Sequence, residues 1–411
     1  MFSSPQTIGQ CDASDALHVV PSQHWIGVIE GPVDRDEACL FHCESPHDGF
    51  IHRPLRTVPV NRLGRQGRFW SFAHLLPESL SQSVDLVHAV NTVPLNAKRF
   101  VIALDGQPAM QDAFASSWHA VLGHRLLRLT SCRRILVRSE IAKRNLRGQF
   151  ELLGLSELAD KLSVFRGFVP ELARDAKGQS AETRMRRRAA RRGDSLQVMF
   201  VGHDAIGMGV IPMLDALETL RRGGLEIRLT LVSRMDAPKS QDLASRSPSI
   251  EKVRDRVDSA PWIRRLATVS RRRVQELAAC HDVLVLPALS HTSGWQIAEA
   301  AMQCCPAIST NLFSLPELIE SNDTGMLMEL PIDGHGQWEG FSLDSERKKN
   351  DAIVQTTRSV SEQLTVLLSI LSQNRDRVDQ LGIAARDKMR SLFGRTAAVG
   401  HLQQVYADAC G

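Results

Sequence analysis

Residues 281–325 carry polar groups at a spacing that suits the binding of an anionic group. The short apolar run VLVLPAL predicts a strand buried on both faces of a parallel sheet, interrupted at Pro287. A polar turn from Ser290 to Gly294 follows, and WQIAEAAMQCC predicts a helix that begins at this turn. The first backbone N–H groups of such a helix have no partners inside it and point at the preceding loop. A second apolar strand is expected at PAIST.

This stretch resembles the donor-binding segment of the retaining glycosyltransferases of the two-domain GT-B fold, family 4. That family has roughly P-S-x-x-E-G-F-G, four further residues, E-A-M-A-x-G-x-P-V-V-A-T, and later P-E-L-I-x-D-G-x-T-G. This chain has PALSHTSG, WQIA, EAAMQCCPAIST and PELIESNDTG. Pro306 and Gly325 match the pattern, and the spacing of its two acidic positions is kept. The second acidic position is Glu299, whereas the first is His291, which is not an acid.

The resemblance implies that Glu299 accepts hydrogen bonds from the ribose hydroxyls of a nucleotide-sugar donor. A carboxylate suits this task because its acceptors can take two adjacent O–H groups. The alternative interpretation is an ordinary exposed glutamate of a helix. The resemblance also makes Ser293, Gly294 and Trp295 candidates for donor contacts. His291 can hydrogen-bond a sugar hydroxyl, but it supplies no formal negative charge to an oxocarbenium-like centre.

A second donor loop is expected where SLQVMFVGHDAIGMGVIPMLDALETLRR predicts a strand, a loop and an amphipathic helix. The segment resembles F-V-G-R-L-x-x-x-K-G-V-d-x-L-L-x-A, and Gly202 and Gly209 match it. The family's Arg and Lys, which hold the donor diphosphate, are replaced by His203 and Met208. Methionine carries no charge, and histidine is only fractionally protonated near neutral pH. Candidates for the missing cations lie where strand ends should approach the nucleotide: Arg234, Arg264 and Arg265.

The first half of the chain has two well-defined predicted strands, SVDLVHAVN and RFVIALDGQP. His88 resembles the histidine of the family's D-V-V-H strand end, and strand ends face the ligand crevice of an open α/β sheet. Asp105 follows the second strand, where the family often carries a histidine beside the donor sugar. Asp105 is therefore either a group near the reacting centre or part of an Asx-type turn with Gly106. His88, Asp105 and His291 are the catalytic candidates.

Two further segments of the first half resemble the family. RRILVRSEIAKRNL predicts a strand and a helix capped by Ser139. KLSVFRGFVP resembles the family's k-i-x-V-i-x-N-G-V, with Arg166 in place of the usual Asn. The basic residues Arg62, Arg65 and Arg68 either face an anionic acceptor or lie in a solvated loop.

The length of 411 residues predicts two domains rather than one core. The resemblance implies an α/β protein with two Rossmann-like domains, whose parallel sheets face a central cleft. We expect an acceptor-side domain at residues 1–175, a basic linker at 176–195, a donor-binding domain at 196–375 and closing helices at 376–411 that cross back to the first domain. The linker contains Arg184, Arg186, Arg187, Arg188, Arg191 and Arg192. It is either a solvated helix or a segment attracted to anionic lipid or polyanionic glycan.

The composition is that of an ordinary globular protein, with 43% apolar and 23% charged residues. A formal net charge of +4 fits an anionic ligand, and no basic motif interleaved with aromatic residues points to nucleic acid. The eight cysteines show no repeated pair at metal spacing, and the group Cys39, His42 and Cys43 has no second half. We therefore expect no metal and no cofactor besides the nucleotide-sugar co-substrate. No apolar run is long enough to span a bilayer, so the expected location is the cytoplasm, with peripheral membrane contact as an open alternative.

Two functions remain open after the departures at His291, Met208 and His203. The first is an active transferase that moves a sugar from a nucleotide-sugar donor to a hydroxyl acceptor with retention, in glycan or glycoconjugate biosynthesis. The second is a catalytically inactive GT-B protein that acts as a glycan- or partner-binding subunit. We expect the first, because residues 293–299 keep the residue types suited to binding phosphate and ribose. The sequence assigns no donor base, sugar, acceptor or oligomeric state.

Overall fold

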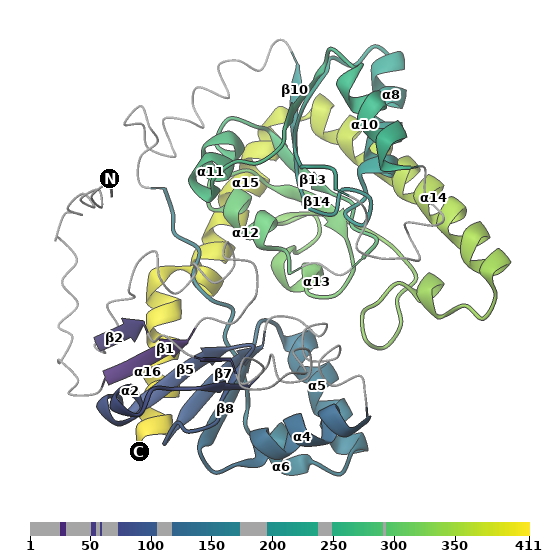
Figure 1. Ribbon diagram of the computed structural model, residues 1–411. Coiled ribbons are helices and arrows are strands. Elements are labelled where there is room, and N and C mark those ends of the chain that lie inside the picture. Colours follow the sequence, from purple (N-terminus) through teal and green to yellow (C-terminus); the bar gives the residue numbers. More distant parts are fainter. Residues whose placement is uncertain are drawn as a thin grey trace, which may run out of the picture.

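The computed structural model describes residues 25–29, 51–54, 58–59, 73–104, 117–172, 195–236, 249–290 and 293–411. These residues form two α/β halves, each built on a parallel sheet of six strands (Figure 1). The expected fold class, an α/β protein with two Rossmann-like halves, is confirmed. Asp105, His291, the cysteine-rich group near residue 40 and the arginine runs at residues 62–68 and 184–192 lie outside the described residues.

The first sheet has the order β2-β1-β5-β7-β8-β9, with every neighbouring pair parallel. Its strands are β1 (Trp25–Ile29), β2 (Ile51–Pro54), β5 (Leu86–Val90), β7 (Phe100–Leu104), β8 (Cys132–Val137) and β9 (Leu162–Val164). All residues of β5 and β7 are buried, as expected for mainly apolar runs in a doubly covered sheet, and His88 is the polar residue among them. Next to this sheet lie α2 (Glu78–Ser83) and a small sheet of β3 (Val58–Pro59), β4 (Ala73–Leu75) and β6 (Val93–Pro94).

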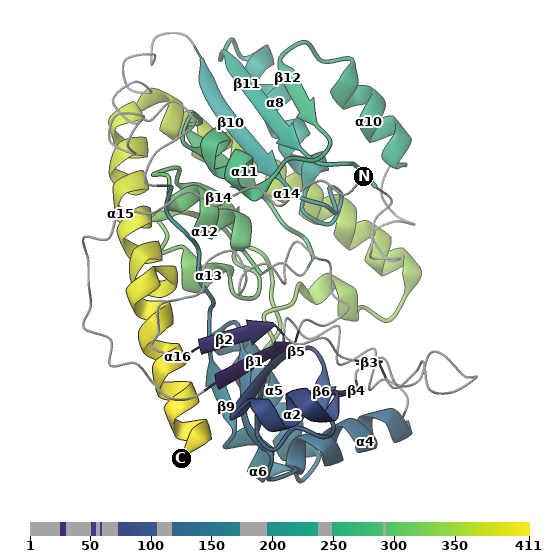
Figure 2. The same cartoon turned by 60° about the vertical axis from the view of Figure 1, so that its left-hand side comes forward.

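Helices cover both faces of the first sheet. Residues of α4 (Ser117–Arg128), α5 (Glu140–Leu152) and α6 (Ser156–Ala159) share one apolar core with the sheet. The last helix of the chain, α16 (Arg395–Cys410), lies against the other face (Figure 2) and shares a separate apolar core with the sheet. Ser139 caps α5 as predicted, because its hydroxyl oxygen accepts the N–H of Ala142 at 3.2 Å.

The second sheet has the order β12-β11-β10-β13-β14-β15 and is also parallel. Its strands are β10 (Leu196–Val201), β11 (Ile227–Val232), β12 (Ile263–Leu266), β13 (Val283–Leu286), β14 (Ala307–Thr310) and β15 (Gly325–Met328). The chain runs outward from β10 to β12 and then returns to the other side of β10 at β13. Between β10 and β13 the strand order therefore reverses, and ligands of open α/β sheets bind at the carboxyl ends of strands at such a point.

Helices of the second half pack around this sheet (Figure 1). They are α8 (Val210–Arg222), α10 (Ile250–Asp258), α11 (Arg271–Ala278), α12 (Trp295–Ala301), α13 (Leu315–Leu318), α14 (Glu346–Gln373) and α15 (Arg375–Phe393), with a short 3-10 helix η2 (Glu339–Ser342). Helix α12 is shorter than predicted. Cys304 has a positive φ of 57°, which ends the helical course and turns the chain into β14 within a few residues.

The crossing between the halves lies at Gly394. Helix α15 contributes to the core of the second half, whereas α16 contributes to a core of the first half. Only Gly394 separates the two helices. A Cβ atom on this glycine would lie 2.2 Å from the carbonyl oxygen of Arg390, so the close approach favours glycine. No described helix is long and apolar enough to cross a membrane.

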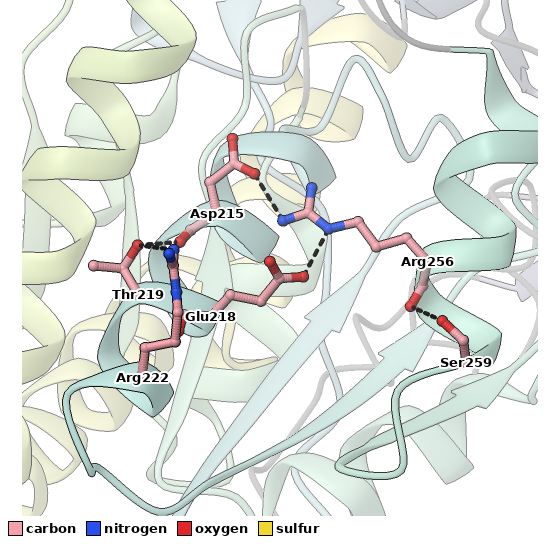
Figure 3. A network of polar contacts seen from close by, with 6 residues as sticks. All are labelled: Asp215, Glu218, Thr219, Arg222, Arg256 and Ser259. Atoms are coloured by element: carbon pink, nitrogen blue, oxygen red, sulfur yellow. Dashed lines mark hydrogen bonds and ion pairs between the residues drawn. The ribbon is translucent and has the colours of Figure 1, made fainter.

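An ion-pair network joins α8 to α10 (Figure 3). Arg256 donates from Nη2 to Asp215 Oδ1 and from Nε to Glu218 Oε1, both at 2.7 Å. Burial lowers the pKa of Arg256, but its hydrogen bonds to these two carboxylates and their negative charges more than offset the effect, so its pKa is raised. The network connects the helix after β10 to the helix before β12.

Candidate functional site

Two loops meet at the point where the second sheet reverses its strand order. Residues 202–209 follow β10, and residues 287–290 follow β13. The backbone N–H groups of Leu289 and Ser290 both donate to the carbonyl oxygen of Gly207, at 2.9 and 3.0 Å. Gly209 has φ of 83°, and a Cβ atom there would lie 1.9 Å from the carbonyl oxygen of Pro287. The two loops therefore form one unit that requires glycine at position 209.

Met208 fills the space above Gly202 within this unit. A Cβ atom on Gly202 would lie 2.3 Å from Met208 Sδ, and Met208 packs against the core of the second half. Asp204 supports the loop, because its Oδ1 accepts the N–H of Gly207 at 2.9 Å. His203 is exposed. The position where the family pattern has a lysine therefore holds an apolar side chain.

Glu299 is a buried carboxylate on α12. Its residue is 6% exposed, which rules out the interpretation as an ordinary exposed helical glutamate. Arg271, the first residue of α11, donates from Nε to Glu299 Oε1 at 2.8 Å. Burial raises the pKa of Glu299 above its ordinary value, and the charge and hydrogen bond of Arg271 only partly offset this. The site thus combines a desolvated acid with one neighbouring cation.

Trp295 anchors the start of α12. Its ring lies 5.4 Å from the ring of Phe393 on α15, and the guanidinium of Arg271 lies 5.7 Å from its centroid. A Cβ atom on Gly167 would lie 2.9 Å from the indole, so Trp295 also reaches a segment that follows the first sheet. These contacts give Trp295 a packing role, and its predicted donor contact remains a prediction.

Gly294 and Ser293 precede α12. Gly294 has φ of 72°, and a Cβ atom there would lie 2.5 Å from Leu318 Cδ1. Glycine is therefore needed at this position for both backbone and space. Ser293 is exposed next to it. Their predicted donor contacts are consistent with this place at the carboxyl side of β13 and remain predictions.

The three predicted substitute cations are not equivalent. Arg234 follows β11, is exposed and pairs with Asp236 at 2.9 Å. Arg264 and Arg265 lie inside the four-residue strand β12, at the edge of the sheet, and their role as substitute cations remains a prediction. Arg265 is engaged by Asp258 at 2.7 Å.

His88 lies in the middle of β5 rather than at a strand end, because the strand continues through Val90. Its ring is fully buried, and its Nδ1 lies 2.7 Å from the Tyr406 hydroxyl of α16. The two rings pack edge to face, with centroids 5.8 Å apart. His88 therefore joins the last helix to the first sheet. The residues that do end β5 are Asn91, with a positive φ of 50°, and Thr92, which is fully buried.

Two functional candidates were missed by the sequence analysis. Arg271 is the first of three consecutive arginines, and no local signal distinguishes it from Arg272 and Arg273. Glu317 belongs to the matched segment PELI, yet its partners come from the other half. Its Oε2 accepts from Arg166 at 2.8 Å and from the N–H of Glu140 at 3.0 Å, and its Oε1 accepts the N–H of Ile141 at 2.9 Å. Only the folded chain brings these groups together.

The described residues contain no group of three or more His, Cys, Asp or Glu side chains placed to hold a metal ion. The groups that gather near the switch point are instead a carboxylate, a guanidinium and backbone amides. Such a set binds hydroxyl and anionic groups.

In sequence, the match to a known family lies in the second half of the chain. Residues 195–333 match the family model described as glycosyl transferases group 1. No curated protein matches the chain in sequence.

Solved structures extend the likeness to almost the whole chain. HepE of Anabaena, solved with UDP and glucose, has a TM-score of 0.61 at 12% identity, over 94% of this chain and 100% of that one. A glycosyltransferase from Rickettsia africae has a TM-score of 0.58 at 12% identity, over 94% and 99%. Sucrose-phosphate synthase from Thermosynechococcus elongatus has a TM-score of 0.58 at 13% identity, over 94% and 98%. The chain therefore has the GT-B fold of glycosyltransferases, with a glycosyl transferases group 1 domain at residues 195–333.

Proposed function

We propose that this protein transfers a sugar from a nucleotide-sugar donor to a hydroxyl acceptor, with retention of the anomeric configuration. The observation that carries the proposal is the buried Glu299 carboxylate, held by Arg271 beside the switch point of the second sheet. Removing a carboxylate from water costs free energy, and hydrogen bonds from bound polar groups offset this cost. The two hydroxyls of a ribose supply such groups. The match of residues 195–333 to glycosyl transferases group 1 and the neighbour solved with UDP and glucose support the same assignment.

In this proposal the two joined loops and the start of α12 receive the donor diphosphate. The first N–H groups of α12 and the side chains of His203 and Arg234 take the place of the missing family cations. His203 is exposed, and Arg234 pairs with Asp236, which is itself exposed, so both can turn toward an anion. No metal ion is part of this mechanism, and activity that survives EDTA is the expected result.

The reacting centre lies between the halves in this proposal. His291 hydrogen-bonds a sugar hydroxyl, and Asp105 supplies the carboxylate that the His291 position lacks. A negative group near the anomeric carbon stabilises the positive charge that develops as the glycosidic bond to phosphate breaks. His88 contributes indirectly, because its contact with Tyr406 helps to hold the first sheet against α16. Product NMR that showed inversion would remove the retaining mechanism.

The test is donor binding and slow donor hydrolysis across a panel of UDP, GDP, ADP and CMP sugars. Wild-type protein is compared with Glu299→Ala and with Glu362→Ala. Glu362 is an exposed glutamate of α14 that pairs with Arg358, so its loss serves as a matched control. We expect one donor to bind and hydrolyse, with both signals lost in Glu299→Ala and kept in Glu362→Ala. An equal response of the wild type and Glu299→Ala would contradict the proposal.

One observation favours a second candidate, a GT-B subunit that binds a glycan or a partner without catalysis. Met208 occupies the family's lysine position and is packed against Gly202, so the diphosphate loses a fixed cation. Binding of a donor without turnover would support this candidate. The alternative outcome, neither binding nor hydrolysis of any donor in the panel, would also support it. Partner pull-down would then identify what the protein binds.

A further inference from the structure

Arg271 contacts two residues of α12 at once. Its Nε donates to Glu299 Oε1 at 2.8 Å, and its guanidinium carbon lies 5.7 Å from the centroid of the Trp295 ring. Trp295 in turn packs against Phe393 and against the backbone at Gly167. The guanidinium therefore contacts both the Trp295 ring and the Glu299 carboxylate. A planar group with five donors suits such a two-sided contact better than a lysine ammonium does.

The neighbouring arginines make different contacts. Arg272 and Arg273 both pair with Glu276 on their own helix, at 3.3 and 3.0 Å, and both are exposed. Arg271 is the member of the run that turns toward α12. It is also the more enclosed one, because its side chain is 34% exposed against 62% for Arg272. The contact with Glu299 is therefore specific to one position of the run.

The hydrogen bond leaves acceptor capacity on the carboxylate. A carboxylate offers about four acceptor positions on its two oxygens, and the Arg271 contact uses one of them on Oε1. Two vicinal hydroxyls can bind to the others. Without the guanidinium, the charge and the hydrogen bond that lower the pKa of Glu299 are lost, so burial raises this pKa further and favours the neutral acid more than in the wild type. A neutral acid accepts weaker hydrogen bonds than a carboxylate does.

We propose that Arg271 is a positioning residue that fixes the orientation and the negative charge of Glu299 for the donor ribose. The proposal rests on the proposed function, in which Glu299 binds the ribose hydroxyls. In this proposal Arg271 does not contact the donor. Its guanidinium hydrogen-bonds the Glu299 carboxylate, and the carboxylate binds the ribose hydroxyls. Its stacking on Trp295 keeps the guanidinium in place when the donor is absent.

Two readouts test it on the full chain with the variants Arg271→Gln, Arg271→Lys and Arg272→Gln. The first readout needs no donor: carboxyl carbon NMR follows the titration of Glu299, assigned with Glu299→Gln. We expect Glu299 in Arg271→Gln to titrate at a higher pH than in wild type, with a smaller change in Arg271→Lys and none in Arg272→Gln. Glutamine keeps a hydrogen-bond donor near the carboxylate and removes the charge, so it separates the two effects.

The second readout is the affinity for the donor that the panel identifies, measured from pH 5 to pH 9. We expect about tenfold weaker binding at pH 7 in Arg271→Gln, recovering as pH rises, because the charge-assisted hydrogen bonds return when the acid ionises. Arg271→Lys should regain part of the affinity. A uniform loss at every pH, with unchanged titration of Glu299, would mean that Arg271 only packs the site and would overturn the proposal.

The outcomes separate this inference from the proposed function. A wild type that binds a donor through Glu299, with an Arg271→Gln variant identical to it in both readouts, would keep the function and remove the role of Arg271. A wild type that binds no nucleotide sugar would remove the proposed function and the ribose role together. Thermal melts of all variants establish that each is folded. If Arg271→Gln is not folded, Arg271→Lys is used in its place for both readouts.

Discussion

Arg166 of the first half and Glu317 of the second half form an ion pair of 2.8 Å across the two domains. The same carboxylate accepts the N–H groups of Glu140 and Ile141, the first two residues of α5. The amino end of a helix has unpaired N–H groups and a partial positive charge. An acidic side chain from one half therefore satisfies the helix end of the other. Both side chains are about one-fifth exposed, so water only partly screens the contact.

We expect Glu317→Ala to loosen the two halves. The loss of three charge-assisted hydrogen bonds at a partly exposed site should destabilise the protein by about 2 kcal/mol. Small-angle scattering should show a larger radius of gyration, and the thermal midpoint should fall. Glu320→Ala is the matched control, because Glu320 is 60% exposed and pairs with Lys388 inside the second half. Equal scattering curves for both variants and the wild type would show that the contact does not hold the domains.

Met208→Lys should strengthen donor binding. The aliphatic part of lysine can cover Gly202 as Met208 does, and its ammonium would restore the cation that the family pattern has at this position. We expect about a tenfold gain in affinity, which weakens with salt because the added interaction is ionic. Calorimetric titration at two salt concentrations measures it, with Met208→Leu as the uncharged control. A gain that appears equally in Met208→Leu would point to packing and not to phosphate binding.

Gly209→Ala tests the unit formed by the two donor-side loops. The substitution combines a left-handed backbone with a Cβ atom 1.9 Å from the Pro287 carbonyl oxygen. Gly224→Ala is a matched control, because its φ is 90° and nothing lies within 4 Å of the added atom. The control should cost about 1 kcal/mol from backbone strain, and Gly209→Ala at least about 2 kcal/mol more. Urea unfolding of both variants measures the difference in unfolding free energy. Similar losses of stability in both would mean that the loops accommodate the added Cβ atom without strain.

Glu299 should make stability depend on pH. Its pKa is raised above 4.5 in the folded state, so only between about pH 4.5 and that raised pKa does the folded protein hold a proton there that the unfolded chain releases. Folding stability from this group is therefore greatest at acid pH and falls as pH rises from about 4.5 through the folded-state pKa.

The difference in unfolding free energy between Glu299→Gln and wild type should shift in favour of the variant over that window. Each unit of pKa difference contributes about 1.4 kcal/mol. Urea unfolding of both proteins at a series of pH values measures the difference. A constant difference from pH 4 to pH 8 would show that Glu299 titrates at its ordinary value.

Local patterns were sufficient for much of the fold. The continuous apolar run FVIAL predicts a buried strand because each residue of a doubly covered strand needs an apolar environment, and LVHAV follows the same pattern except at His88. The Ser139 cap could be predicted because a cap bonds to an amide only three residues away. Gly202 and Gly209 could be placed on one loop because the segment that contains them follows a predicted strand and precedes a predicted helix. Each of these features depends on neighbours in the chain.

The contacts that define the candidate site could not be predicted in this way. Arg271 and Glu299 are 28 residues apart, Arg166 and Glu317 are 151 apart, and His88 and Tyr406 are 318 apart. Which arginine of a run reaches a carboxylate depends on how α11 packs against α12. Whether a histidine lies at a strand end or under a helix depends on where the last helix crosses back. Side chains at these separations meet only after the sheets, their crossovers and the two halves have packed, and that packing is a property of the whole chain rather than of any single segment.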